Sequence, residues 1–198
     1  MKKRAIFLDR DGVINEMVHH QEFGIIDSPA NPLEFKLLPG VGKALKKLKS
    51  LGFLLILISN QPGIAKRKFT LTLHKKINEK MKRNLAQNGV EFDGIYYCLH
   101  HPKAKDSKYR KICNCRKPKM GLIEKAEQDF DIDLKNSWFV GDGVDDVLVG
   151  NIVGIKMVLL ATKKVDILKL LDEKNAKPDF FALDLQEACS IIEKRRMK

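Results

Sequence analysis

The feature that most constrains the fold is a pair of aspartates directly after a short apolar run near the N-terminus. The run from Ala5 to Leu8 is followed by Asp9, Asp11 and Gly12. An apolar run of this length predicts a buried strand of a parallel sheet, and open α/β sheets bind ligands at the carboxyl ends of their strands. Alternation along an extended chain places both carboxylates on one side, where they repel each other unless a hard cation such as Mg²⁺ lies between them. The alternative is an ordinary surface turn rich in Asp.

A second apolar run, residues 53–59, also ends in small polar side chains, Ser59, Asn60 and Gln61. The Ser59 hydroxyl and the neighbouring backbone N–H groups are suited to hold a phosphate, and Asn60 and Gln61 are further candidate substrate or phosphate contacts. The competing interpretation is a strand closed by ordinary turn residues.

Basic and acidic groups follow in two later segments. Lys117 lies in a basic run before a predicted helix and could neutralise a phosphate and a nucleophile together, or belong to a solvated basic patch. A third apolar run, 138–140, leads to Asp142, which is placed to complete the Mg²⁺ site. Asp146 could orient that site by hydrogen bonding or cap the helix that begins there, whereas Asp145 is best explained as a favourable charge in the first helical turn.

These four motifs, in this order, resemble the haloacid dehalogenase superfamily of phosphatases over residues 5 to about 160. The resemblance implies that Asp9 is the nucleophile and forms an aspartyl-phosphate, and that Asp11 is the general acid and base. It also implies a Mg²⁺ site and a set of phosphate contacts. The implied Mg²⁺ ligands are Asp9, the backbone carbonyl of Asp11, and Asp142, and the implied phosphate contacts are Ser59 and Lys117.

Two tight pairs of metal-binding side chains lie between the second and third motifs. Cys98 and His100 form one pair and Cys113 and Cys115 the other, a set that suits tetrahedral Zn²⁺. The polar segment between the pairs has little means of ordering itself, which favours a structural metal. A disulfide is the alternative, although a reducing cytoplasm is expected because no secretory or transmembrane run is visible. His101 is an alternative fourth ligand, but we expect it to be an exposed side chain.

The cysteine pairs together with the phosphatase motifs resemble one subgroup, which contains the heptose bisphosphate and histidinol-phosphate phosphatases. Residues 60–65 and 68–70 look more like the heptose enzymes, which implies a phosphorylated sugar as substrate and Arg116 as a further phosphate contact. Those enzymes usually carry a lysine where this chain has Gly143. The fourth cysteine, Cys189, is expected to be a buried apolar side chain.

The remaining pattern predicts a single domain, residues 1–198, with a three-layer Rossmann-like α/β fold, a central parallel sheet and no separate cap domain. We expect strands at 4–8, 53–59, 95–98, 137–140, 156–160 and 179–182, and helices at 41–51, 71–88, 120–130, 145–153, 165–171 and 185–195.

Residues 16–38 form the least regular stretch, since three prolines argue against a helix there. Because the stretch follows the catalytic motif, we expect a flap over the site rather than a plain surface connection. His19, His20 and Glu22 are expected to be solvated.

The formal net charge of +12 attracts anions, but the lysines are spread over several predicted helices with few aromatics between them. Nucleic acid is therefore an unlikely partner, and a phosphorylated metabolite and a monomeric protein without membrane association are expected. A histidinol-phosphate phosphatase, a DNA 3′-phosphatase and a silent zinc-containing binding module remain the alternatives.

Overall fold

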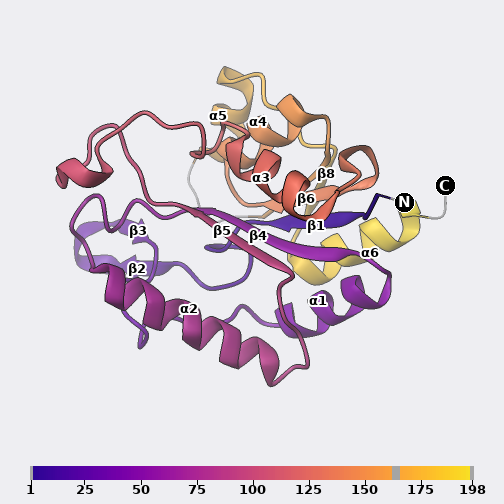
Figure 1. Ribbon diagram of the computed structural model, residues 1–198, viewed down its shortest axis with the longest axis horizontal. Helices are drawn as coiled ribbons and strands as arrows, with labels where there is room; N and C mark the ends of the chain where they lie inside the picture. The colour runs from indigo at the N-terminus through magenta and orange to yellow at the C-terminus, as the bar shows by residue number, and fades with distance from the viewer. Residues whose placement is uncertain (1, 162–165, 197–198) are drawn as a thin grey trace.

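The computed structural model describes residues 2–161 and 166–196, and its centre is a six-stranded parallel sheet (Figure 1). All five neighbouring strand pairs within this sheet are parallel. The strands, in their spatial order, are β5 (Gly94–Cys98), β4 (Leu54–Asn60), β1 (Ala5–Leu8), β6 (Trp138–Gly141), β7 (Lys156–Leu160) and β8 (Phe180–Ala182).

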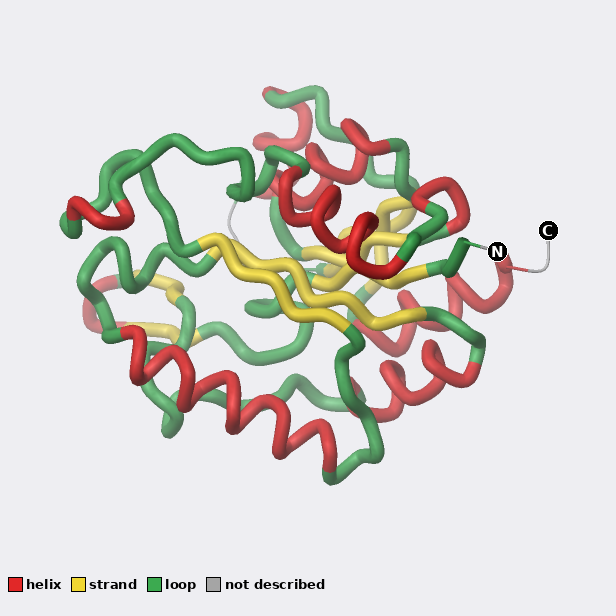
Figure 2. The backbone as a smooth tube through the Cα atoms, in the orientation of Figure 1, coloured by secondary structure: helices red, strands yellow, loops and turns green. Residues whose placement is uncertain are grey.

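Helices cover both faces of this sheet, as Figures 1 and 2 show. One face carries α1 (Val41–Ser50), α2 (Leu71–Ala86) and α6 (Leu185–Arg196). The other carries α3 (Gly121–Phe130), α4 (Val144–Val153) and α5 (Ile167–Glu173). The three-layer α/β fold predicted from the alternating pattern is therefore confirmed.

Strict alternation along the strands produces two separate hydrophobic cores. In β1, Ile6 and Leu8 pack toward α1, α2 and α6, whereas Ala5 and Phe7 pack toward α3 and α4. This is the two-residue period of an extended chain that is buried on both faces. The apolar runs in the sequence read as uniform because each strand supplies both cores.

The predicted elements match the observed ones to within about two residues, which is the usual disagreement at element ends. The predicted helix 165–171 begins in residues that lie partly outside the described ones, and its observed part starts at Ile167. Two short 3₁₀ turns, Ser107–Tyr109 and Leu134–Asn136, were not predicted.

The stretch 16–38 is more regular than its sequence indicates. It contains an antiparallel hairpin of β2 (Val18–His20) and β3 (Ile25–Asp27), joined by the 3₁₀ turn η1 (Gln21–Phe23). Strands this short carry little hydrophobic alternation, so no periodic pattern indicates them. The hairpin lies beside the N-terminal end of α2 (Figure 1), and Asp27 pairs with Lys68. The side chains of this hairpin that were expected to be solvated are indeed exposed: His19, His20 and Glu22.

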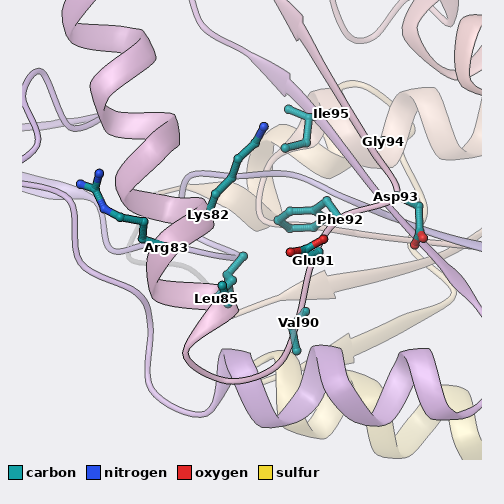
Figure 3. Close-up of a pocket in the computed structure, with 10 residues that line it drawn as sticks. Lys82, Arg83, Leu85, Val90, Glu91, Phe92, Asp93, Gly94 and Ile95 are labelled. Carbon is teal, nitrogen blue, oxygen red and sulfur yellow. The ribbon is translucent and has the colours of Figure 1, made fainter.

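A cavity of about 650 Å³ lies where α2 ends and the chain leads into β5 (Figure 3). Leu85, Val90 and Phe92 line it, with charged side chains such as Lys82 and Glu91 at its edge. It lies at the amino end of β5, whereas α/β sheets bind their substrates at the carboxyl ends. None of the described helices is long and apolar enough to cross a membrane.

The start of β1 depends on a buried serine. The backbone N–H of Ala5 donates to the Ser137 Oγ at 2.9 Å, and this hydroxyl in turn donates to the carbonyl of Asp133 at 2.6 Å. Ser137→Ala leaves the Ala5 N–H buried without its acceptor, so we expect a loss of about 1–3 kcal/mol in the free energy of unfolding. Urea denaturation measures it.

Ser190→Ala is the matched control, because the Ser190 hydroxyl bonds a carbonyl on the exposed side of α6. We expect that control to stay within about 0.5 kcal/mol of the parent. Equal stability of the two variants would contradict the role assigned to Ser137.

Candidate active site and metal centres

Three neighbouring strands bring the predicted site residues together. Asp9 directly follows β1, Ser59 lies near the end of β4, and Asp142 directly follows β6. Since β4, β1 and β6 are adjacent, their carboxyl ends form one edge of the sheet. The backbone N–H of Asp9 also donates to the Val140 carbonyl at 3.1 Å, which fixes the turn out of β1.

The buried ammonium of Lys117 is the central charge of the site. Its Nζ lies 3.0 Å from the Asp9 Oδ1 and 2.6 Å from the Asp146 Oδ1, and it donates to the Ile58 carbonyl at 3.0 Å. Burial alone would lower the pKa of Lys117, but the Asp146 and Asp9 carboxylates outweigh burial and raise it. Lys117 is therefore a permanent cation although only 3% of its side chain is exposed.

Asn60 holds the backbone of Lys117 in place. Its Oδ1 accepts from the Lys117 N–H at 3.0 Å, and its Nδ2 donates to the Lys117 carbonyl at 3.1 Å. The Asn60 side chain is thus engaged with the loop that carries the lysine, and its predicted contact with phosphate stays a prediction.

Three carboxylates form the candidate Mg²⁺ centre. One oxygen each from Asp9, Asp142 and Asp146 lies within 4.8 Å of the others. The Asp146 Oδ2 accepts from the backbone N–H groups of Asp142 and Gly143 at 3.2 and 3.0 Å, so Asp146 both orients the centre and caps α4. Burial raises the pKa of Asp9 against the charge of Lys117. The set holds three carboxylates, and two of them, Asp9 and Asp146, share the one ammonium of Lys117.

The backbone of Gly12 leaves the room that this centre needs. Gly12 has φ +84°, and a Cβ built there would lie 2.1 Å from the Asp142 Oδ2. An unbalanced set of hard oxygen donors, beside a backbone kept free of side chains, fits a divalent cation such as Mg²⁺. The side chain of Asp11 is not part of this set, so the carboxylates grouped here are not the pair for which the sequence predicted a shared cation. That the Asp11 carbonyl is a ligand stays a prediction.

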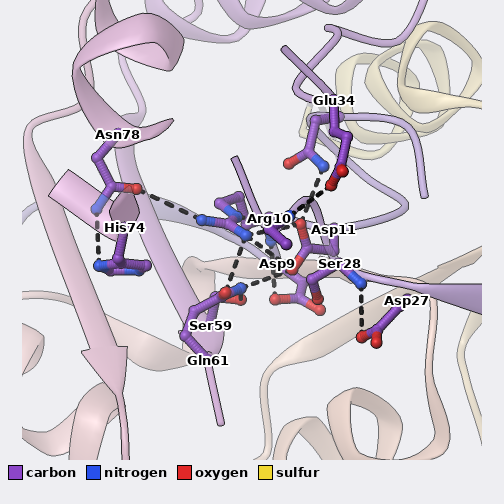
Figure 4. Close-up of polar contacts among 12 residues, drawn as sticks. Asp9, Arg10, Asp11, Asp27, Ser28, Glu34, Ser59, Gln61, His74 and Asn78 are labelled. Atoms are coloured by element: carbon purple, nitrogen blue, oxygen red, sulfur yellow. Dashed lines mark hydrogen bonds and ion pairs between the residues drawn. The ribbon is translucent and has the colours of Figure 1, made fainter. Parts of the chain in front are cut away.

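The Asp11 carboxylate is held by a buried network of donors, shown in Figure 4. Arg10 donates to it from Nε at 3.1 Å and from Nη2 at 3.0 and 3.2 Å, Asn15 donates at 2.9 Å, and Gln61 donates at 2.6 Å. Burial would raise the pKa of Asp11, but the Arg10 charge and the hydrogen bonds from Asn15, Gln61 and Ser28 lower it below its usual value.

Gln61 and Ser59 lie side by side between the two aspartates. The Gln61 Nε2 donates to the Ser59 Oγ at 3.1 Å as well as to Asp11, and Ser59 is hydrogen-bonded to Asp9. Gln61 contacts Arg10, Asp11 and Ser59, and its predicted contact with phosphate stays a prediction. Arg116, in contrast, has a buried Nη1 with no hydrogen-bond partner in the described part of the chain.

Asn78 and Tyr97, which support Arg10, were not predicted from the sequence. The Arg10 side chain is fully buried, and its Nη1 donates to the Asn78 Oδ1 of α2, which also accepts from the Tyr97 hydroxyl of β5. An arginine between the two motif aspartates was the available signal, since a buried guanidinium needs partners on every side. Nothing local in the sequence identifies Asn78 or Tyr97, because only the packing of α2 against β5 brings them there.

The four predicted zinc ligands form one cluster. Cys98 ends β5, His100 follows it, and Cys113 and Cys115 lie in the segment before α3. The sulfur atoms of Cys98, Cys113 and Cys115 are 3.2–3.5 Å apart, and the His100 Nδ1 lies 3.3 Å from the Cys115 Sγ. A disulfide needs sulfur atoms about 2.05 Å apart, so these are separate thiols. Sulfur donors about 2.3 Å from a central ion lie about 3.8 Å from one another, so these side chains need to separate by only a few tenths of an ångström to hold tetrahedral Zn²⁺.

Other predicted residues lie outside the cluster. The His101 Nδ1 accepts from the Lys103 N–H at 3.1 Å and is not among the four, as expected. Cys189 is buried in the core beneath α6, also as expected. The zinc loop, residues 98–115, also bonds to the segment that follows β4: the Ala65 carbonyl accepts from the N–H groups of Lys105 and Asp106 at 2.9 and 3.2 Å.

Known proteins are similar to this chain in sequence and in fold. The HAD-hydrolase-like family model matches residues 114–188. The D-glycero-beta-D-manno-heptose-1,7-bisphosphate 7-phosphatase of Haemophilus ducreyi is 42% identical over 166 residues, which is 83% of this chain and 86% of that protein. The enzyme of the same name from Escherichia coli K12 is 40% identical over 81% of each chain.

A solved structure agrees with these sequence matches. The D,D-heptose 1,7-bisphosphate phosphatase of B. bronchiseptica, crystallised with magnesium and phosphate, is 28% identical and has a TM-score of 0.78. The alignment covers 97% of this chain and 99% of that one. The chain therefore belongs to the haloacid dehalogenase-like phosphatases, in the family that contains these heptose bisphosphate enzymes.

Proposed function

We propose that this protein removes the 7-phosphate of D-glycero-D-manno-heptose 1,7-bisphosphate in a Mg²⁺-dependent reaction through a phosphoaspartate on Asp9. The observation that carries the proposal is the buried Lys117 ammonium bonded to Asp9 and Asp146, beside Asp142, at the carboxyl ends of three adjacent strands. Phosphoryl transfer needs an aligned nucleophile and neutralised charge, and this arrangement supplies both. The names of the relatives at about 40% identity support the choice of sugar.

In the first half-reaction, an Asp9 oxygen attacks phosphorus while the bond from phosphorus to the sugar oxygen breaks. In the substrate complex the negative phosphate beside Asp11 opposes the charge of Arg10 and raises the pKa of this carboxyl, so that it carries a proton. Asp11 gives that proton to the departing oxygen, and Lys117 and the Ser59 hydroxyl stabilise charge on the transferred group. In the second half-reaction, Asp11 takes a proton from the water that attacks the phosphoaspartate. Inorganic phosphate leaves and Asp9 is restored, so protons and bonds balance over the cycle.

Asp9, Asp142 and the Asp11 carbonyl would hold Mg²⁺, with Asp146 orienting them. When bound there, Mg²⁺ supplies the positive charge that offsets the dianionic phosphate beside the carboxylates. Gly143 offers no side-chain cation, so Arg116 is our candidate for binding the sugar's phosphates, because its Nη1 is buried without a described partner.

The zinc cluster has a structural part in this proposal. Zn²⁺ on Cys98, His100, Cys113 and Cys115 would close the loop that bonds to Ala65, in the segment that follows β4. Thiols held in a metal cluster suit a reducing compartment, which supports a cytoplasmic location. The hairpin β2–β3 is our candidate for a flap, and a monomer stays a prediction.

A substrate panel tests the proposed function. We expect kcat/KM with Mg²⁺ to be highest for a heptose 1,7-bisphosphate anomer, above fructose bisphosphate, histidinol phosphate and a 3′-phosphorylated oligonucleotide. A preference for histidinol phosphate or the oligonucleotide would overturn the substrate but keep the chemistry. If neither heptose bisphosphate anomer nor any of the three other compounds releases phosphate, the result would favour a silent binding module instead.

Asp9→Asn removes the nucleophile without changing the size of the side chain. We expect kcat on the preferred substrate to fall by at least about 10³-fold, because the amide cannot form the phosphoaspartate. Asp145→Asn is the matched control, since that acid is exposed at the start of α4, and we expect it to keep near-wild-type activity. Activity of Asp9→Asn near that of the control would exclude Asp9 as the nucleophile.

Gly12→Ala tests the Mg²⁺ centre. The added Cβ would displace the Asp142 carboxylate, so we expect the Mg²⁺ concentration for half-maximal activity to rise by about tenfold or more, equivalent to about 1.4 kcal/mol. Gly24→Ala controls for backbone strain, because Gly24 also has a positive φ, of 59°, but nothing lies within 4 Å of its Cβ position. Unchanged Mg²⁺ dependence in Gly12→Ala would argue against Asp142 as a ligand.

Zinc removal tests the structural role of the cysteine cluster. We expect chelation, or the variant Cys115→Ser, to make residues 99–112 sensitive to trypsin, because the loop loses its cross-link. Metal analysis should find about one zinc per chain in the parent and in the control Cys189→Ala. Protease resistance that survives loss of zinc would contradict a structural clip.

A further inference from the structure

Hydrogen bonds connect α2 with Asp11 through Arg10 (Figure 4), and Tyr97 of β5 joins the same chain of contacts. Tyr97, in β5, donates from its hydroxyl to the Asn78 Oδ1 at 2.8 Å. Arg10 donates from Nη1 to the same oxygen at 3.5 Å and reaches Asp11 with its other nitrogens. The reaction steps described above use Asp11 but give Asn78 and Tyr97 no part.

The orientation of the Asn78 amide is determined by its neighbours. Its Oδ1 receives two donors, while its Nδ2 lies 3.3 Å from the His74 Nδ1. An amide nitrogen only donates, so the His74 Nδ1 accepts and the ring proton lies on Nε2. Burial, with the Arg10 charge, lowers the pKa of His74 to about 4, which keeps the ring neutral. A flipped Asn78 would direct its NH₂ group at Arg10.

The guanidinium of Arg10 transmits this orientation to Asp11. The Arg10 side chain is fully buried, and its Cζ atom lies 5.9 Å from the centre of the Tyr97 ring. Its Nη2 donates to the Gln61 Oε1 at 2.9 Å, and Gln61 in turn donates to Asp11. The position of the Asp11 carboxylate is therefore set from two sides by one planar group that Asn78 holds at its far end.

We propose that Asn78 and Tyr97 are positioning residues that act through Arg10 to hold the Asp11 carboxylate where it can transfer a proton to the leaving oxygen. The inference rests on the proposed function, since it assigns a purpose to the surroundings of the general acid. General acid catalysis depends on hydrogen-bond geometry, and a catalytic group kept by rigid surroundings loses efficiency when they are removed.

Dependence on the leaving group separates this role from a merely structural one. Phenyl phosphate releases a basic oxygen that needs a proton, whereas 2,4-dinitrophenyl phosphate releases an oxygen that does not. A misplaced Asp11 therefore slows the first compound and spares the second, while a distorted nucleophile or metal centre slows both. The parameter to compare is kcat/KM, because it covers the steps up to departure of the leaving group.

Asn78→Leu keeps the shape of the side chain and removes both of its polar atoms. We expect kcat/KM for phenyl phosphate to fall by about 10–100-fold, part of the roughly 10²–10⁴-fold that general acid catalysis contributes, and that for 2,4-dinitrophenyl phosphate to stay within about threefold. Tyr97→Phe deletes one hydroxyl and carries the same test in milder form, should Asn78→Leu fail to fold. Met81→Ala controls for a buried change in α2 outside the network.

The inference is supported if kcat/KM falls for phenyl phosphate but not for 2,4-dinitrophenyl phosphate in Asn78→Leu or Tyr97→Phe, and if Met81→Ala shows no such selective fall. Equal losses on both compounds, or no loss on either, would overturn it and leave the proposed function intact. A wild-type protein that hydrolyses neither compound nor the sugar bisphosphate would overturn the proposed function, and this inference with it.

Discussion

The ion pairs of Lys117 are the interaction on which the active site depends. A charge with 3% exposure is tolerated only where partners replace its water, and here two carboxylates and a backbone carbonyl do so. The lysine in turn makes it possible for Asp9 and Asp146 to lie close together in the interior. Removing one member of such a group leaves the others uncompensated, so fold and chemistry cannot be varied independently at this point.

The division of labour between the two aspartates of the first motif follows from their surroundings. Asp9 faces the lysine and the other acids, whereas Asp11 is turned into a set of neutral and cationic donors. Burial raises the pKa of the first, and Arg10 helps to lower that of the second. Two identical side chains, two residues apart, thereby acquire different electrostatic environments.

The sequence allowed most of the fold to be predicted because its strands are short apolar runs closed by polar residues. The carboxyl ends of β1 and β4 were identifiable for this reason. The metal cluster was identifiable because Cys98 and Cys115 each belong to a closely spaced pair of metal-binding residues. The hairpin β2–β3 was not predicted, because three-residue strands leave no periodic signal.

Within the site, the sequence indicated which residue types matter better than what each one touches. Asn60 and Gln61 were identified as candidate site residues, but their hydrogen bonds to Lys117 and Asp11 were not predicted. The hydrogen bond between Arg10 and Asn78 could not be predicted, because Asn78 lies in α2, in a distant part of the chain. Such contacts arise from packing, which a pattern of residue types does not encode.

Strand β5 joins two sites that the sequence keeps separate. Its last two residues point to opposite faces of the sheet: Tyr97 packs with the core beneath α2, and Cys98 enters the zinc cluster beside α3. One peptide unit thus anchors both the metal clip and the far end of the Arg10 network. Loss of zinc would then loosen the same end of β5 that supports the Arg10 and Asp11 network. The proposed dephosphorylation would in this way depend on zinc supply although zinc does not contact the substrate.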